Sequence, residues 1–236
     1  MGLENRVAVI AGATGGLGRV VTASLAARGM RVALMGSNAG RLQALVQELE
    51  LTEGTYSTYV LNILDRTAAA AAARAVVERM GRVDALFNFV GGWLGGKTVV
   101  ETSAPEVQEM LGRHFWTTFN LAQVFVPHLL ANQWGRIAVV MSAAATTPGT
   151  KKLPYAVGKA AQQTLMLALA EELKGTGVTA NMLVVNTIDT QHERDRAPSP
   201  KNALWTTPEE IVTALLYLLS DDAQGVNGVR LPLYGG

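Results

Sequence analysis

The sequence contains no cysteine, so it can form neither a disulfide framework nor a thiolate metal site. Its three histidines, His114, His128 and His192, are scattered along the chain and lack the spacing that metal ligands show. We therefore expect no bound metal.

Charged residues are also scarce, because they make up only 17% of the 236 residues and leave a formal net charge of +1. A nearly neutral chain does not attract nucleic acid or an anionic membrane by charge alone, so neither is expected as a partner. No apolar run is long enough for a membrane span or a signal peptide. We expect a cytoplasmic protein that acts on a small-molecule substrate.

Hydrophobic residues, in contrast, are abundant at 49%, and they form short runs that alternate with longer helical patterns. Such runs indicate strands buried on both faces, and their alternation with helices predicts one doubly wound α/β domain over residues 1–236 with a mostly parallel, seven-stranded sheet. The expected strands are 6–11, 31–35, 55–61, 83–89, 136–141, 178–185 and 229–233. The expected helices lie near 16–28, 38–50, 67–80, 105–131, 154–174 and 208–219.

A glycine-rich turn, A-G-A-T-G-G-L-G at 11–18, lies between the first expected strand and the first helix. Its glycines allow a tight turn and let backbone N–H groups approach a pyrophosphate at the helix N-terminus. The spacing G-x-x-x-G-x-G differs from the common G-x-G-x-x-G, and a purely structural turn is the alternative. The position after the first strand favours a dinucleotide. The candidate contacts are Gly12, Thr14, Gly16, Leu17 and Gly18.

Tyr155 and Lys159 are spaced by one helical turn, which places a phenol and an ammonium on the same helix face. The ammonium favours the phenolate, so the lysine is expected to lower the pKa of the tyrosine from about 10. Ser142 lies thirteen residues before Tyr155 and can hydrogen-bond a developing oxyanion. The alternative is a Tyr/Lys pair on a surface helix without a catalytic role. Together with the dinucleotide turn, the pair indicates proton transfer.

With these motifs the chain resembles the short-chain dehydrogenase/reductase family over nearly its whole length. The family's T-G-x-x-x-G-x-G appears at 11–18 with Ala11 replacing Thr, and its N-N-A-G appears as Asn88-Phe89-Val90-Gly91. Its Ser and Tyr-x-x-x-Lys fall on Ser142, Tyr155 and Lys159, and further matches are Asn181 and Thr190.

This resemblance implies a Rossmann-type fold and NAD(P)H-dependent hydride transfer between nicotinamide and a carbonyl or alcohol. It implies that Tyr155 is the general acid, that Lys159 also holds the nicotinamide ribose, and that Ser142 polarises the substrate oxygen. Beyond the glycine turn and this trio, the implied cofactor contacts are Asn62, Ile63, Asn88, Val90, Gly91, Ile188 and Thr190.

Three positions depart from the family pattern. His114 stands where the family has an Asn that holds a proton-relay water near the lysine, so His114 is either a relay residue or a core histidine with satisfied ring nitrogens. Val185-Asn186 replaces a Pro-Gly pair, and Asn62 replaces an Asp that contacts adenine, with Asp65 three residues on. These changes put the relay and the nicotinamide-side loop in doubt.

The cofactor type depends on the end of the second strand, where NAD users of the family place an Asp for the ribose 2′-hydroxyl. Here that position is Gly36, followed by Ser37, and no carboxylate would repel a 2′-phosphate. Ser37 can donate to that phosphate, and Arg19 and Arg41 are near in sequence. NADP is therefore favoured over NAD.

The segment N-F-V-G-G-W-L-G-G-K at 88–97 resembles the corresponding loop of the dihydropteridine reductases. Trp93 in this loop is expected to form a planar apolar wall for a flat substrate, and the alternative is a tryptophan that covers the cofactor or packs at a subunit contact. A polar, proline-containing segment at about 191–204 is expected to be a short lid that is mobile until ligand binds.

The sequence thus predicts an NAD(P)H-dependent oxidoreductase of carbonyl or alcohol substrates. Reduction of a quinonoid pterin is the alternative reaction. A cofactor-binding regulator without turnover is the alternative of another class. Family likeness and the apolar content of helices 105–131 and 154–174 favour a homo-oligomer, either a tetramer or a dimer.

Overall fold

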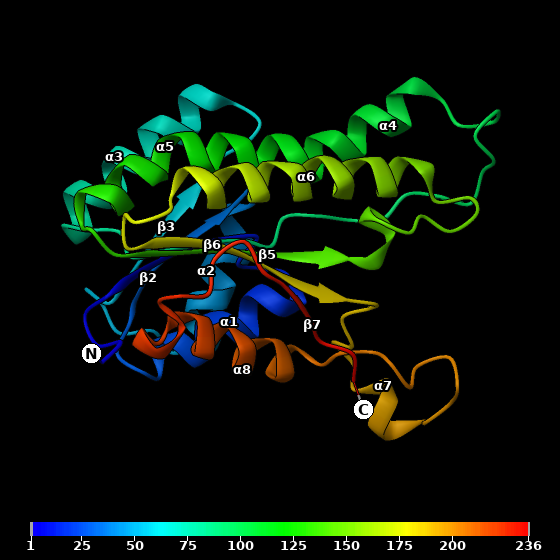
Figure 1. Cartoon of the computed structure of the whole chain (residues 1–236). Coiled ribbons are helices and arrows are strands. Elements are labelled where there is room, and N and C mark those ends of the chain that lie inside the picture. The colour runs from blue at the N-terminus through cyan, green and yellow to red at the C-terminus, as the bar shows by residue number, and fades with distance from the viewer. Residues whose placement is uncertain (1, 236) are drawn as a thin grey trace.

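The computed structural model describes residues 2–235, which fold as one Rossmann-type α/β domain around a seven-stranded sheet (Figure 1). All neighbouring strands are parallel, and their order is β3-β2-β1-β4-β5-β6-β7. The doubly wound fold predicted from the sequence is confirmed. The strands are β1 (Val7–Ala11), β2 (Arg31–Gly36), β3 (Tyr56–Val60), β4 (Ala85–Asn88), β5 (Gly135–Ser142), β6 (Val178–Val185) and β7 (Arg230–Pro232).

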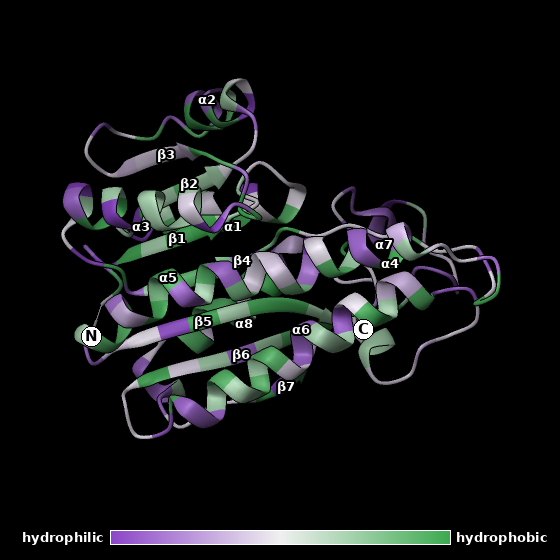
Figure 2. Ribbon diagram, turned by 90° about the horizontal axis from the view of Figure 1, so that it is seen from above, coloured by the Kyte–Doolittle hydropathy of each residue, from purple (hydrophilic) through white to green (hydrophobic). Residues whose placement is uncertain are grey.

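Helices cover both faces of this sheet. One layer contains α3 (Arg66–Met80), α5 (Thr117–Ala131) and α6 (Leu153–Glu172), and the other contains α1 (Gly16–Ala26), α2 (Ala39–Glu48) and α8 (Pro208–Leu219) (Figure 1). Successive side chains of a strand enter opposite cores, as Met182 and Leu183 of β6 do. The middle strands are therefore hydrophobic over most of their length (Figure 2).

The strand order reverses between β1 and β4, which are hydrogen-bonded neighbours although the chain passes through β2 and β3 between them. In such a sheet the loops at the carboxyl ends of the two strands diverge and leave a crevice for a ligand. The glycine turn follows β1, and Phe89, Val90 and Gly91 follow β4. The fold thus brings two separate sequence motifs to one crevice.

Pairing of β1 with β4 is reinforced at the opposite end of the sheet by the fully buried Asp84. Its carboxylate accepts from the Val7 backbone N–H at 2.8 Å and from the Arg82 guanidinium at 2.6 and 2.8 Å, and Arg6 lies 3.7 Å away. These bonds satisfy a charge that would otherwise be costly to bury. They stabilise the sheet away from the crevice.

The helix predicted over residues 105–131 is interrupted. The chain forms α4 (Ala104–Leu111), then a π-helical segment η1 (Gly112–Trp116), and then α5. The Thr117 N–H bonds the Gly112 carbonyl, five residues back, as in a π-helix. This wide turn holds His114 in the protein interior, where its side chain is 1% exposed.

Smaller elements complete the chain. They are the 3-10 segments η2 (Ala143–Ala145) and η3 (Asp221–Ala223) and the short helix α7 (Glu193–Arg196), which the sequence did not predict. Pro232 lies on the edge strand β7, where a missing N–H is tolerated. Within residues 2–235 no helix is long and apolar enough to span a membrane.

Candidate active site

Two adjoining cavities open at the carboxyl end of the sheet and share Phe89, Val90 and Gly91 as lining residues. The larger has a volume of about 540 Å³ and is lined by loops after β4 and β6 and by side chains of η1 and α6. The smaller, of about 350 Å³, lies between the glycine turn and the end of β3. The pair has the elongated, two-part form that a dinucleotide requires.

The glycine turn fits closely against the loop after β4. A Cβ on Gly12, whose φ is +76°, would lie 2.9 Å from the Val90 nitrogen, and a Cβ on Gly18 would overlap the Gly12 carbonyl. A Cβ on Gly16 would lie 2.5 Å from the Thr190 methyl group. Only glycine fits these positions, and the first N–H groups of α1 have no side-chain cap. Such a helix start can hold a pyrophosphate.

The smaller cavity is lined by seven of the predicted cofactor residues, which are Gly12, Thr14, Ser37, Asn62, Ile63, Val90 and Gly91. Arg113 is the only charged residue among its described lining residues. Arg19 forms an ion pair with Glu48 instead. Asp65 accepts from the N–H groups of Thr67 and Ala68 as the N-cap of α3, so it has a structural role.

The larger cavity contains Asn88, Trp93, His114, Tyr155, Lys159 and Ile188, all of which the sequence singled out. Other candidates lie close to the cavities without lining them. Leu17 is buried in the core, Gly16 and Gly18 form the helix start, and Thr190 packs against Gly16. Asn181 binds the Val226 carbonyl and the Val229 N–H, which is a structural role.

Ser142, at the end of β5, lies next to Tyr155 on α6, where its hydroxyl favours the phenolate. The Ser142 hydroxyl oxygen also accepts from the Ala144 N–H at 3.2 Å, which fixes its position. Burial raises the pKa of Tyr155, and the neighbouring Ser142 hydroxyl only partly opposes this rise. The phenol is therefore protonated at neutral pH.

Lys159 is fully enclosed on the next turn of α6. Its ammonium donates to the Val140 carbonyl at 2.7 Å and to the Gln162 side-chain oxygen at 3.0 Å. Burial lowers the pKa of Lys159 to about 7. The expected lowering of the Tyr155 pKa by Lys159 is thus wrong for this structure, because burial dominates at the phenol and Lys159 itself is only partly charged near neutral pH.

His114 donates from Nε2 to the Gly92 carbonyl at 3.0 Å, and its ring meets the Tyr155 ring edge-on with centroids 5.4 Å apart. Burial and the charge of Lys159 lower the pKa of His114 to about 3. The imidazole is therefore neutral, with a proton on Nε2 because a carbonyl only accepts. Its Nδ1 has no hydrogen-bond partner among the described residues. Of the two ring nitrogens that the core-histidine alternative expected to be hydrogen-bonded, only Nε2 is.

Trp93 lines the larger cavity but is 61% exposed. Its indole packs against the loop backbone, since a Cβ on Gly95 would lie 2.9 Å from the ring. The Gly96 N–H donates to the Lys151 carbonyl at 2.7 Å, which attaches the loop to the segment before α6. The residue forms one rim of the cavity.

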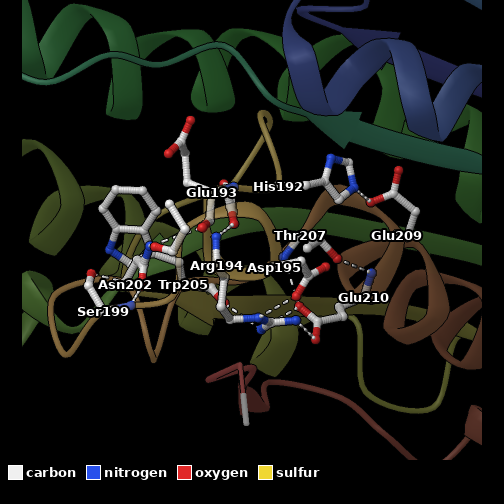
Figure 3. Close-up of polar contacts among 12 residues, drawn as sticks. His192, Glu193, Arg194, Asp195, Ser199, Asn202, Trp205, Thr207, Glu209 and Glu210 are labelled. Atoms are coloured by element: carbon white, nitrogen blue, oxygen red, sulfur yellow. Dashed lines mark hydrogen bonds and ion pairs between the residues drawn. The ribbon is translucent and has the colours of Figure 1, made fainter.

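The predicted lid is a folded loop that is closed at its base. The Asp189 N–H donates to the Thr206 carbonyl at 2.8 Å, and the Thr206 N–H donates to the Thr187 carbonyl at 3.0 Å. Within the loop, the Asp189 carboxylate caps α7, and Arg194 binds the Trp205 carbonyl and the Glu210 carboxylate (Figure 3). Its mobility stays a prediction, and opening would have to break these bonds.

Two buried residues, Gln162 and Thr118, escaped the sequence analysis although they contact the site. Gln162 bonds both Lys159 and Thr118, and Thr118 bonds Asn88. Gln162 lies three residues after Lys159 and seven after Tyr155, so helical spacing placed it on the same face. Arg113, next to His114, gave no signal because its place in the smaller cavity depends on the π-helical turn.

Comparison with known proteins agrees with this geometry. A family model described as short chain dehydrogenase matches residues 6–201. The 3-oxoacyl-[acyl-carrier-protein] reductase FabG of Thermotoga maritima is 28% identical over 244 residues, which cover 100% of this chain and 99% of that protein.

Solved structures share the fold. The L-sorbose reductase of Gluconobacter frateurii, complexed with NADPH and L-sorbose, has a TM-score of 0.86 at 22% identity, over 100% of this chain and 97% of that one. An NAD⁺-bound xylitol dehydrogenase has a TM-score of 0.86 at 21% identity, over 99% of both chains. This chain belongs to the short-chain dehydrogenase family and is an NAD(P)-dependent oxidoreductase that acts on a carbonyl or alcohol.

Proposed function

We propose that this protein reduces a carbonyl group with NADPH and that Tyr155 supplies the proton. The observation that carries the proposal is the placement of Tyr155 and Lys159 in the larger cavity, with Ser142 next to the phenol and the smaller cavity of the glycine turn adjoining. The nicotinamide supplies the hydride when it is bound. The protein orients the substrate, polarises its oxygen and delivers a proton.

Each of the three residues has one task in this scheme. Ser142, fixed by the Ala144 N–H, donates toward the substrate oxygen, where negative charge develops. Tyr155 gives its proton to the same oxygen. Lys159 holds the ribose with the donor that Val140 and Gln162 leave free, since an ammonium has three donors.

The raised pKa of Tyr155 supports reduction as the direction. A reductase needs its acid protonated at the start of the reaction, and a buried phenol meets this condition at neutral pH. Alcohol oxidation would need a phenolate, which the same burial disfavours.

For His114 we propose a positioning role in place of proton relay. A group whose pKa is about 3 does not exchange protons at neutral pH. Its Nε2–H instead holds the Gly92 carbonyl, next to Trp93, and so fixes the rim of the cavity. The ring also fills the space beside Gly158, where a Cβ would lie 3.1 Å from His114 and 2.6 Å from the Met110 carbonyl.

We propose NADP as the preferred cofactor. No carboxylate lies among the described residues that line the smaller cavity, and Ser37 is exposed at its edge. Arg113 also lines this cavity, and its guanidinium is paired with Glu109. A ribose 2′-phosphate is therefore not repelled there and can accept a hydrogen bond from Ser37.

A flat conjugated substrate such as a quinonoid pterin is the second candidate. It is favoured by Trp93 at the cavity rim, and the relatives described above lend it no support. A regulator without turnover is not proposed, because the family consists of enzymes and Ser142, Tyr155 and Lys159 converge in the structure.

We further propose a cytoplasmic homo-oligomer, a tetramer or a dimer, that pairs through α5 and α6. Trp116, Leu130 and Leu167 are exposed on this side of the molecule. A groove of about 330 Å³ between the two helices is lined by apolar residues, among them Phe119, Val126 and Leu165. A second copy of the chain would cover this apolar surface.

Tyr155→Phe should lower kcat by about 10²–10⁴-fold, the usual contribution of a general acid, while NADPH affinity stays near the wild-type value. NADPH oxidation with a small ketone panel and a fluorescence titration of NADPH measure the two quantities. Tyr217→Phe, at an exposed tyrosine of α8, is the control. A Tyr155→Phe enzyme that keeps more than about a tenth of the rate would remove Tyr155 as the acid.

His114→Asn should make the protein less sensitive to acid. The folded pKa of His114 is about 3 and the ordinary value is 6.5, so its unfolded form binds a proton first and stability is lost as pH falls from 6.5 toward 3. Urea unfolding at pH 7 and pH 4 should show a wild-type loss that exceeds the variant's by on the order of a few kcal/mol. His128→Asn, the same change on α5, is the matched control. If the free energy of unfolding falls equally between pH 7 and pH 4 in wild type and His114→Asn, the imidazole is not held neutral in the folded protein.

Ser37→Asp should shift preference toward NADH, because a carboxylate there repels a 2′-phosphate and accepts from a 2′-hydroxyl. The ratio of kcat/KM for NADPH to that for NADH should fall by about tenfold or more, and Ser37→Ala separates loss of the hydroxyl from gain of charge. An unchanged ratio would mean that the ribose is recognised by other residues, such as Arg41 or Arg113.

Trp93→Ala should raise KM for flat conjugated substrates by roughly three- to tenfold with little change in kcat, because stacking is similar in ground and transition states. Trp116→Ala, on the proposed subunit surface, should leave KM unchanged. If Trp93→Ala alters the oligomer and not KM, the residue is a packing residue and the pterin candidate loses its support.

The oligomer can be tested by light scattering at micromolar protein concentration. We expect a mass of two or four chains, and Leu167→Glu should lower it because a charge would enter the apolar contact. A monomer mass for the wild-type protein would overturn the assignment.

A further inference from the structure

Lys159 is a buried cation without a counter-ion. Its side chain is enclosed between α6, β5 and η1, and none of the described carboxylates forms an ion pair with it. The protein offers it two neutral oxygens, the Val140 carbonyl and Gln162 Oε1. The carbonyl belongs to the backbone, so Gln162 is the one side chain that can be exchanged to alter this support.

Gln162 is itself 1% exposed, and both polar atoms of its side chain form hydrogen bonds. Its Nε2 donates to Thr118 Oγ1 at 2.9 Å, while its Oε1 accepts from Lys159. Thr118 Oγ1 also accepts from Asn88 Nδ2 at 2.8 Å, and its hydroxyl donates to the His114 carbonyl at 2.7 Å. Residues of four elements, α5, α6, β4 and η1, thus meet at one hydroxyl group.

The directions of these bonds are fixed by the backbone. The Val90 N–H donates to Asn88 Oδ1 at 3.0 Å, so the Asn88 NH₂ group faces Thr117 and Thr118. Thr118 must donate to the His114 carbonyl, which can only accept, and its lone pairs then receive Asn88 and Gln162. Gln162 is left with its oxygen toward Lys159.

A reversed Gln162 amide would point NH₂ at Lys159, and this arrangement suits only a neutral amine with a free lone pair. A neutral amine could donate to the same two oxygens, but a charged donor forms the stronger hydrogen bonds. The fixed amide oxygen therefore favours the ammonium and opposes the effect of burial. Other titratable or charged groups near Lys159 are Tyr155 on the same helix and His114 and Arg113 on η1. His114 is neutral, and Arg113 pairs with Glu109 at 2.7 Å.

We propose that Gln162, oriented by Thr118, is a positioning residue that keeps Lys159 protonated and directed at the nicotinamide ribose. The part that concerns the ribose rests on the proposed function. The hold on the ammonium does not, because it follows from the hydrogen bonds alone. The series of hydrogen bonds from Val90 through Asn88, Thr118 and Gln162 to Lys159 also connects the loop after β4 to the lysine. The loop and the lysine are therefore held by one hydrogen-bond network.

The first test is the titration of Lys159, followed by NMR of protein labelled with ¹³C at lysine Cε and assigned with Lys159→Met. In Gln162→Leu the midpoint should fall by about one pH unit, since a hydrogen bond to a charged group is lost. Gln162→Glu should raise it above the wild-type value, because a carboxylate favours the ammonium. Gln163→Leu, the same change one residue on, should leave it unchanged.

The second test is the pH dependence of NADPH affinity. Above neutral pH, Gln162→Leu should bind NADPH about tenfold more weakly than wild type, which corresponds to one pH unit of lost protonation. Thr118→Val should shift the Lys159 midpoint in the same direction by freeing the Gln162 amide, and this variant decides the matter if Gln162→Leu fails to fold.

A folded Gln162→Leu or Thr118→Val protein with the wild-type Lys159 midpoint would overturn the inference, even if carbonyl reduction proceeds. A wild-type protein that binds no nicotinamide nucleotide would instead overturn the proposed function. In that case the lysine titration still decides whether Gln162 holds the ammonium.

Discussion

The chemistry of the site depends on one unfavourable burial, that of the Lys159 ammonium. A carboxylate would stabilise this charge, but none of the described carboxylates pairs with it, and its pKa is lowered to about 7. Neutral oxygens support the ammonium without cancelling its field, so in the proposed function the charge remains available to a bound ribose. The same field, together with burial, keeps His114 neutral.

Space is the second constraint. The imidazole of His114 occupies the region between η1, α6 and the loop after β4, and glycine is required around it. A Cβ on Gly91 would lie 3.0 Å from the ring, and one on Gly158 would lie 3.1 Å from it. The change from Asn to His at position 114, relative to the family pattern, is therefore coupled to the Gly-Gly-Trp loop, which the imidazole holds by a hydrogen bond that fixes its own tautomer.

The sequence predicted the parts of the site that depend on local spacing. Tyr155 and Lys159 share a helix face because they are one turn apart, and the turn after β1 carries glycine at 12, 16 and 18, where a Cβ would meet neighbouring atoms. The doubly wound sheet followed from the alternation of apolar runs and helices. What escaped prediction depends on tertiary packing. The π-helical turn at 112–116 and the enclosure that raises the Tyr155 pKa are set by contacts between distant segments.

These two constraints together support the proposed direction of the reaction, which is reduction. An enclosed, nearly uncharged pocket disfavours a phenolate, so Tyr155 starts as an acid, and a lysine near its titration point does little to change that before a ligand arrives. When negative charge develops on the substrate oxygen, Ser142 and the ammonium become worth more, because the low dielectric that penalised them strengthens their attraction to that charge. Their contribution is thus concentrated in the transition state, which is where binding free energy raises kcat.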